Sequence, residues 1–107
     1  MVCEIELAAV IGKSCRNVSE EDSLDYIQGY FLSSDLTCFR WKPISPFADT
    51  FYLKFWEDLT PVSNFIDASV LKNPVNVQLD LQIVRSDTKV KESFGFNTGD
   101  MIWSLQE

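Results

Sequence analysis

The sequence predicts a small α+β domain that is rich in β-strand and has one or two short helices. Residues 77–84 (VQLDLQIV) alternate apolar and polar side chains, which is the period of a half-buried strand. Residues 19–22 (SEED) resemble a helix start, because serine caps helices and acidic residues suit the first turn. The 107 residues are 46% apolar and contain 4 Gly and 4 Pro, which excludes a linker or a disordered chain. We therefore expect a single domain over residues 1–107.

Residues 2–11 predict the first strand. Cys3, Ile5 and Leu7 alternate with two glutamates, and an apolar run follows before Gly12. We expect this strand to begin half exposed and to end buried.

A helix is predicted over residues 20–28, with Ser19 as its cap. Gly29 suits the position just after a helix end, because glycine adopts left-handed backbone angles without strain. Residues 30–37 (YFLSSDLT) then predict a second strand with a polar interruption.

The middle of the chain, residues 39–61, is expected to be mostly loop, because prolines interrupt it. Within it, the aromatic run at residues 50–56 (TFYLKFW) predicts one buried strand. A connector over residues 62–74 leads to the last predicted motif.

That motif is a hairpin. Residues 77–84 form its first arm, residues 85–87 its turn and residues 88–93 its second arm. Residues 95–100 are expected to be a loop.

Charge and composition exclude several classes of function. The chain carries 9 Lys and Arg against 16 Asp and Glu, so no basic surface for nucleic acid is expected. It has no His, which excludes a His-containing triad or His-ligated zinc within these residues. Its 3 cysteines lack a CxxC spacing and predict reduced thiols in an intracellular compartment. No apolar run reaches the about 20 residues of a membrane helix, so no membrane partner is expected.

Three carboxylates form the candidate site. Glu4 and Glu6 are two residues apart on a strand and therefore point to the same face. Asp35 lies within the second predicted strand and could complete an all-oxygen site for Mg²⁺, or for Mn²⁺ or Ca²⁺. The alternative interpretation is a solvated glutamate pair on an edge strand, which needs no ligand.

The first third of the chain resembles the catalytic domain of the fumarylacetoacetate hydrolase family. Residues 4–12 (EIELAAVIG) are similar to the family's E-x-E-L-A-x-V-I-G, and residues 25–30 (DYIQGY) to its D-Y-x-x-G-Y. Residues 35–37 (DLT) match its D-[VLM]-[ST] strand. Looser similarities extend the resemblance over most of the chain, at residues 49–51, 77–91 and 98–104.

This resemblance implies a partial fumarylacetoacetase-like domain, a mixed β-sheet roll. It implies Mg²⁺ held by Glu4, Glu6 and Asp35, and a small 1,3-dicarbonyl or 2-oxo acid as substrate. The implied reactions are metal-dependent hydrolysis of a carbon–carbon bond, decarboxylation or tautomerisation, because a divalent cation stabilises an enolate.

Departures from the family pattern bear on which reaction we expect. The family's hydrolases use a His–Glu pair, and this chain has no His. The family's K-S-F-D-T-F lysine polarises the substrate, and Pro46 occupies its place in an ungapped alignment. Lys42 is the candidate substitute. Tautomerisation or decarboxylation is therefore favoured over hydrolysis, which also needs a positioned base.

A second function remains open beside the enzyme. The chain could be an inactive, truncated relative that serves as an interaction or structural module, either as a homodimer or paired with a full-length relative. For both functions we expect a cytoplasmic location, with the mitochondrion as the alternative.

Overall fold

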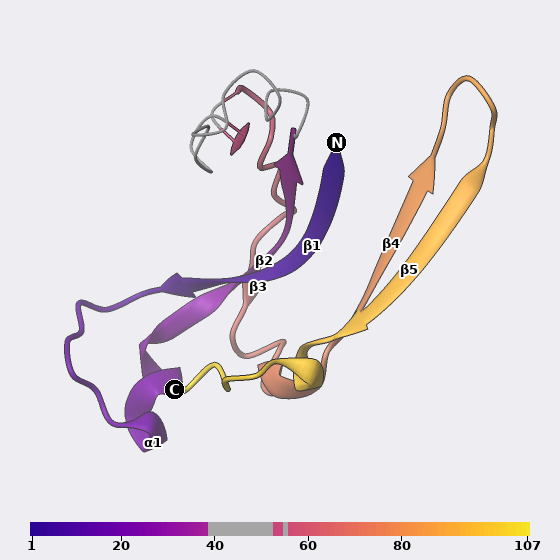
Figure 1. Cartoon of the computed structure of the whole chain (residues 1–107). Helices are drawn as coiled ribbons and strands as arrows, with labels where there is room; N and C mark the ends of the chain where they lie inside the picture. Colours follow the sequence, from indigo (N-terminus) through magenta and orange to yellow (C-terminus); the bar gives the residue numbers. More distant parts are fainter. Residues whose placement is uncertain (39–52, 55) are drawn as a thin grey trace. The chain divides into compact units, whose positions relative to one another are not determined.

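The structure is a computed structural model of the whole chain, and it describes residues 1–38, 53–54 and 56–107 (Figure 1). A three-stranded sheet has the order β1 (Val2–Ile11), β2 (Ile27–Thr37), β3 (Ile66–Asp67), and β4 (Gln78–Val84) pairs with β5 (Lys91–Asn97). In the described residues, the short α-helix α1 (Glu20–Ser23) runs into the 3₁₀ turn η1 (Leu24–Tyr26). Two further 3₁₀ turns, η3 (Pro74–Asn76) and η4 (Thr98–Asp100), precede β4 and follow β5. The predicted β-rich α+β class is confirmed.

The chain divides into two compact units. The first comprises residues 1–8 and 31–64, and the second comprises residues 9–30 and 65–107. Strands β1 and β2 each contribute residues to both units.

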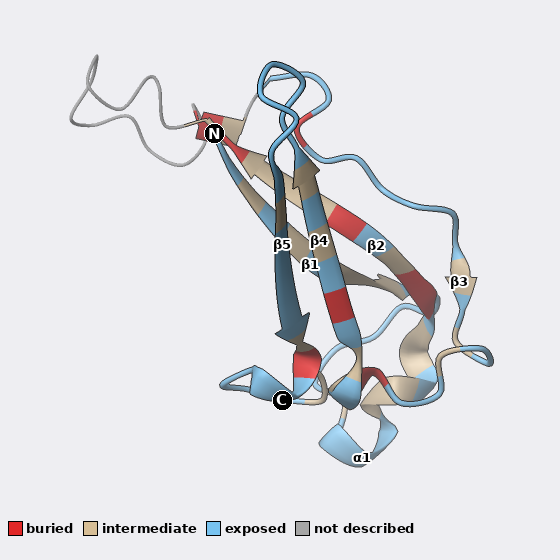
Figure 2. Ribbon diagram, turned by 90° about the vertical axis from the view of Figure 1, so that its right-hand side faces the viewer, coloured by how far each residue is buried: buried red, intermediate tan, exposed pale blue. Residues whose placement is uncertain are grey.

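In the first unit, β2 holds the segment around residues 53–63 through backbone hydrogen bonds. The amide of Leu36 donates to the carbonyl of Leu59 at 2.8 Å, and that of Cys38 donates to the carbonyl of Leu53 at 3.0 Å. Leu53 and Leu59 are buried there, and so is Thr37 of β2. Figure 2 colours the buried residues red. These bonds hold Leu53 beside the end of β2, and they place the next residue, Lys54, there as well.

The buried strand predicted over residues 50–56 is wrong where the structure describes it. Leu53 and Lys54 have helical backbone. An aromatic run has no period, so its composition could not separate a strand from a helical turn. The remainder of that stretch, apart from Trp56, lies outside the described residues, as do Lys42, Pro46 and residues 49–51.

In the second unit, the predicted helix begins as expected and ends early. The amide of Asp22 donates to the hydroxyl of Ser19, the N-cap, at 3.3 Å. The α-helix ends at Ser23, and β2 begins at Ile27 instead of at residue 30. A helix this short gains little from its own hydrogen bonds, so pairing of the following residues in the sheet decides where it ends.

Gly29 serves the sheet and not the helix end. It pairs with Asp67 of β3, while Tyr30 pairs with Ile66. A Cβ atom at residue 29 would overlap the ring of Phe65 and the carbonyl oxygen of Ile66. Only glycine permits this close approach of the two strands.

The predicted hairpin is confirmed, with a longer turn than expected. β4 and β5 pair without interruption from Gln78↔Asn97 to Val84↔Lys91. The second arm therefore begins at residue 91, not 88, and it continues through part of the predicted 95–100 loop. Lys89, which has a positive φ of 56°, donates its amide to the carbonyl of Arg85 at 2.8 Å inside the turn.

Candidate functional site

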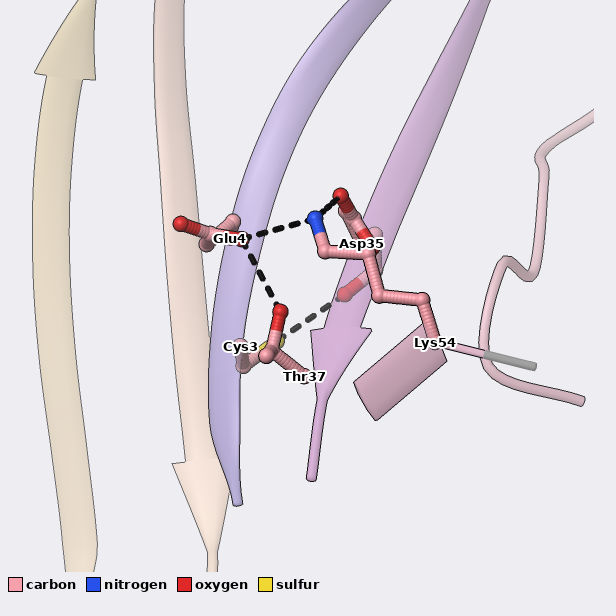
Figure 3. A network of polar contacts seen from close by, with 6 residues as sticks. Cys3, Glu4, Asp35, Thr37 and Lys54 are labelled. Carbon is pink, nitrogen blue, oxygen red and sulfur yellow. Dashed lines mark hydrogen bonds and ion pairs between the residues drawn. The ribbon is translucent and has the colours of Figure 1, made fainter. Parts of the chain in front are cut away.

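Two carboxylates on neighbouring strands converge on one lysine in the first unit. Asp35 of β2 accepts a hydrogen bond from the Lys54 ammonium, and the Glu4 carboxylate of β1 lies 3.5 Å from the same Nζ (Figure 3). The side chains of Asp35, Lys54 and Glu4 are 19%, 31% and 51% exposed. The Asp35 carboxylate is therefore the most buried group of the cluster, and the Glu4 carboxylate is the one most exposed to water.

Strand alternation explains this cluster. Asp35 and Thr37 are two residues apart on β2 and share a face. The Thr37 hydroxyl donates to Oε2 of Glu4 at 3.3 Å, so the adjacent β1 presents Glu4 to that same face. The residues just before Glu4 and Asp35 point to the other face and make a separate contact, since Cys3 Sγ lies 2.9 Å from Ser34 Oγ.

The charges around Lys54 favour its protonated form. The hydrogen bond to Asp35 raises the pKa of the Lys54 ammonium above its ordinary value, partial burial offsets some of that rise, and the charges of Asp35 and Glu4 add to it. Lys54 is therefore a fixed positive charge at neutral pH, suited to donate hydrogen bonds and not to accept protons.

Glu6, the third predicted metal ligand, does not join this contact network. It is exposed on β1, two residues from Glu4, and makes no hydrogen bond or ion pair with the residues that the structure describes. Within that same part of the chain, no three acidic or Cys side chains lie close enough together to hold a metal ion.

The pair of Glu4 and Asp35 nevertheless fits a hard divalent cation by its chemistry. Mg²⁺ takes oxygen ligands and is often bound through one or two carboxylates, with water filling its other positions. The two carboxylates already share a positive charge, the Lys54 ammonium. The ligand set of Glu4, Glu6 and Asp35 stays a prediction.

Lys54 is a candidate site residue that the sequence patterns described above do not single out. An ungapped comparison with the family's K-S-F-D-T-F leads to Pro46, but Lys54 also has an aromatic residue two positions later and an acid three positions later, at Trp56 and Glu57. That local pattern, K-x-W-E, could have identified it. The structure adds the decisive contact, because Lys54 reaches Asp35.

In the described residues, no helix has both the length and the apolar character needed to cross a bilayer.

Comparisons with known proteins agree with the fold. The family described as "Fumarylacetoacetate (FAA) hydrolase C-terminal" matches residues 1–107. A mitochondrial oxaloacetate tautomerase of Arabidopsis thaliana is 34% identical over 105 residues, which is 95% of this chain and 44% of the relative. A mitochondrial oxaloacetate decarboxylase of Dictyostelium discoideum is 30% identical over 104 residues, 95% of this chain and 45% of the relative.

Among solved structures, a candidate fumarylpyruvate hydrolase from Burkholderia cenocepacia superposes with a TM-score of 0.74 at 25% identity. The match covers 97% of this chain and 44% of that protein. The chain thus spans less than half the length of the proteins it matches. It belongs to the fumarylacetoacetate hydrolase family, through that family's C-terminal domain.

Proposed function

We propose that this chain enolises small 2-oxo acids or 1,3-dicarbonyl acids, as a tautomerase or decarboxylase of the oxaloacetate type. The observation that carries the proposal is the convergence of Glu4, Asp35 and Lys54 on one spot of the sheet. Relatives named as oxaloacetate tautomerase and oxaloacetate decarboxylase support the substrate class.

The proposed site combines a cation with an ammonium group. Glu4 and Asp35 would hold Mg²⁺, or Mn²⁺ or Ca²⁺, with Glu6 as the predicted third ligand. Bound there, the cation would act as a Lewis acid for the substrate's oxygens. Lys54 would donate a hydrogen bond to the oxygen on which negative charge gathers as a proton passes from the neighbouring carbon to solvent water at this half-exposed site.

Enolisation suits this chain better than hydrolysis does. Cleavage of a carbon–carbon bond by water requires a base that activates the water, and these 107 residues contain no His. Lys54 keeps its proton at neutral pH even at the ordinary lysine pKa, so it is not that base. Stabilisation of an enolate needs positive charge, which Lys54 supplies and a bound cation would add, and solvent water can take the proton that leaves the carbon at this half-exposed site.

The test is the rate at which oxaloacetate converts between its keto and enol forms, followed by ultraviolet absorbance with Mg²⁺ present. Asp35→Asn is expected to lower the catalysed rate by about 100-fold or more, because it removes the charge that holds the cation and Lys54. Asp80→Asn is the matched control, since Asp80 is exposed on β4 and its side chain is hydrogen-bonded only to Gln78 among the described residues. Equal rates for Asp35→Asn and the control would contradict the proposal.

A second candidate function is association without catalysis. One face of the hairpin carries Leu79, Leu81, Phe94 and Phe96, and the two phenylalanines are 44% and 48% exposed. Exposed apolar surface of this kind favours pairing with another chain, either a second copy or a longer relative. A monomer in size-exclusion chromatography that turns over oxaloacetate would rule this candidate out.

We also infer an intracellular location, in the cytoplasm or the mitochondrion. Cys3, Cys15 and Cys38 are all free thiols, as expected in a reducing compartment. The relatives named above are mitochondrial.

A further inference from the structure

One oxygen of the Glu4 carboxylate is contacted by two groups of different character. The Thr37 hydroxyl donates to Oε2 at 3.3 Å, and the Lys54 ammonium lies 3.5 Å from the same Oε2 (Figure 3). The other oxygen, Oε1, has no hydrogen bond or ion pair with residues 1–38, 53–54 or 56–107. One side of the carboxylate is therefore held, and the other is open to a ligand.

The two groups on Oε2 differ in how readily they can be replaced. The Lys54 side chain is 31% exposed, and its contact is one of charge, so a second cation can take its place. Thr37 is only 4% exposed, it is neutral, and its branched side chain has restricted rotamers. Within the part of the chain that the structure describes, its hydroxyl has Glu4 as its side-chain partner and no other.

Building on the cation site of the proposed function, we propose that Thr37 is a positioning residue for Glu4. It holds Oε2 when a divalent cation replaces the Lys54 ammonium, so the carboxylate stays oriented with Oε1 available. A hydrogen bond of 3.3 Å is long for a hydroxyl and a carboxylate, so Thr37 acts through orientation and not through strength. Partners of this type typically change metal affinity by about 10- to 100-fold when they are removed.

The opposite face of the same two strands provides a matched control. Ser34 is one of the hydroxyl residues of β2 and contacts Cys3 at 2.9 Å, in the same way that Thr37 contacts Glu4. Ser34→Ala removes a hydroxyl from the same strand pair without touching the carboxylates. We expect it to leave cation binding unchanged.

The experiment measures Mn²⁺ binding by calorimetry and by the electron paramagnetic resonance signal of free Mn²⁺, at fixed pH and ionic strength. Thr37→Val, which keeps the shape and removes the hydroxyl, is expected to weaken binding by about 10-fold. Thr37→Ser, which keeps the hydroxyl, should retain most of the affinity. In the wild type, saturating Mn²⁺ should raise the rate of amine labelling of Lys54 relative to the exposed Lys91, because Lys54 is released.

Thermal unfolding without metal shows whether each variant folds. If Thr37→Val does not fold, the comparison moves to Thr37→Ala against Thr37→Ser, which again differ by the hydroxyl. The inference is overturned if the variant without the hydroxyl binds Mn²⁺ as the wild type does, if Thr37→Ser binds as weakly as Thr37→Val, or if Mn²⁺ leaves Lys54 labelling unchanged. In each of those cases the proposed function stands. A wild type that binds no divalent cation overturns both.

Discussion

At the scale of single residues, Lys54 shows which site residues local sequence patterns cannot identify. Glu4 and Asp35 can be named as candidate site residues from the sequence, because each lies in a short pattern on a recognisable strand. Lys54 lies 19 residues beyond Asp35, after a loop-rich stretch, and its place depends on the path of the chain. Spacing along the sequence does not encode that path. The sequence alone therefore points to Lys42, and not to Lys54, as the candidate lysine of the site.

The ion pairs of Lys54 predict a specific dependence of stability on pH. Because the folded state raises the pKa of Lys54 above its ordinary value of 10.5, it binds the proton more tightly than the unfolded chain does. The stabilisation is therefore fully present below pH 10.5 and is lost as the pH rises through the folded-state value. The difference in free energy of unfolding between wild type and Lys54→Met should be constant near neutral pH and should shrink as the pH rises above 10.5.

Denaturant unfolding between neutral pH and pH 11.5 measures this difference, where the upper limit is chosen about one unit above the ordinary lysine value. Lys91→Met is the control, because Lys91 is exposed on β5 and has no ion pair among the described residues. A Lys54→Met difference that persists unchanged at the highest pH would show that the contact is not electrostatic.

At the scale of elements, a strand with strict alternation is predicted more closely than the end of the helix. Alternation over residues 77–84 identified β4 almost to the residue, because a two-residue period has few alternative explanations. The predicted helix end is wrong because a glycine at position 29 fits two interpretations. It can follow the end of a helix, or it can allow two strands to approach closely. Only the partner strand β3, which is two residues long and has no pattern of its own, distinguishes them.

Gly29→Ala is expected to destabilise the protein by about 1 to 3 kcal/mol, since the added methyl group overlaps a backbone carbonyl that cannot move freely. Gly95→Ala should change stability by less than about 0.5 kcal/mol. Its Cβ would lie 2.9 Å from the side-chain amide of Gln78, an exposed group that can turn away. Chemical denaturation of both variants measures the two effects, and equal destabilisation would argue against a tight β2–β3 contact.

At the scale of the whole molecule, the family resemblance predicted the fold class and the strand-rich architecture, which periodicity alone supports only in part. The division into two units could not be read from the sequence. The reason is that β1 and β2 are continuous strands whose residues are shared between the units, so no linker or change of composition marks the boundary.

Shared strands predict that both units unfold together. A variant with Trp41→Phe and Trp103→Phe reports on the first unit through Trp56, and one with Trp41→Phe and Trp56→Phe reports on the second through Trp103. Both fluorescence transitions should coincide with the loss of far-ultraviolet circular dichroism. Two separated midpoints would mean that each unit folds by itself.

The contact between Thr37 and Glu4 also bears on the order of events as the chain folds. It joins residues 33 positions apart, whereas the hairpin turn closes over a few residues. Long closures cost more chain entropy and tend to form late. We therefore expect the acidic pair to be assembled late in folding, so that an incompletely folded chain would lack the proposed cation site. Cation binding would thus distinguish fully folded molecules from nascent or partly unfolded ones in the same sample.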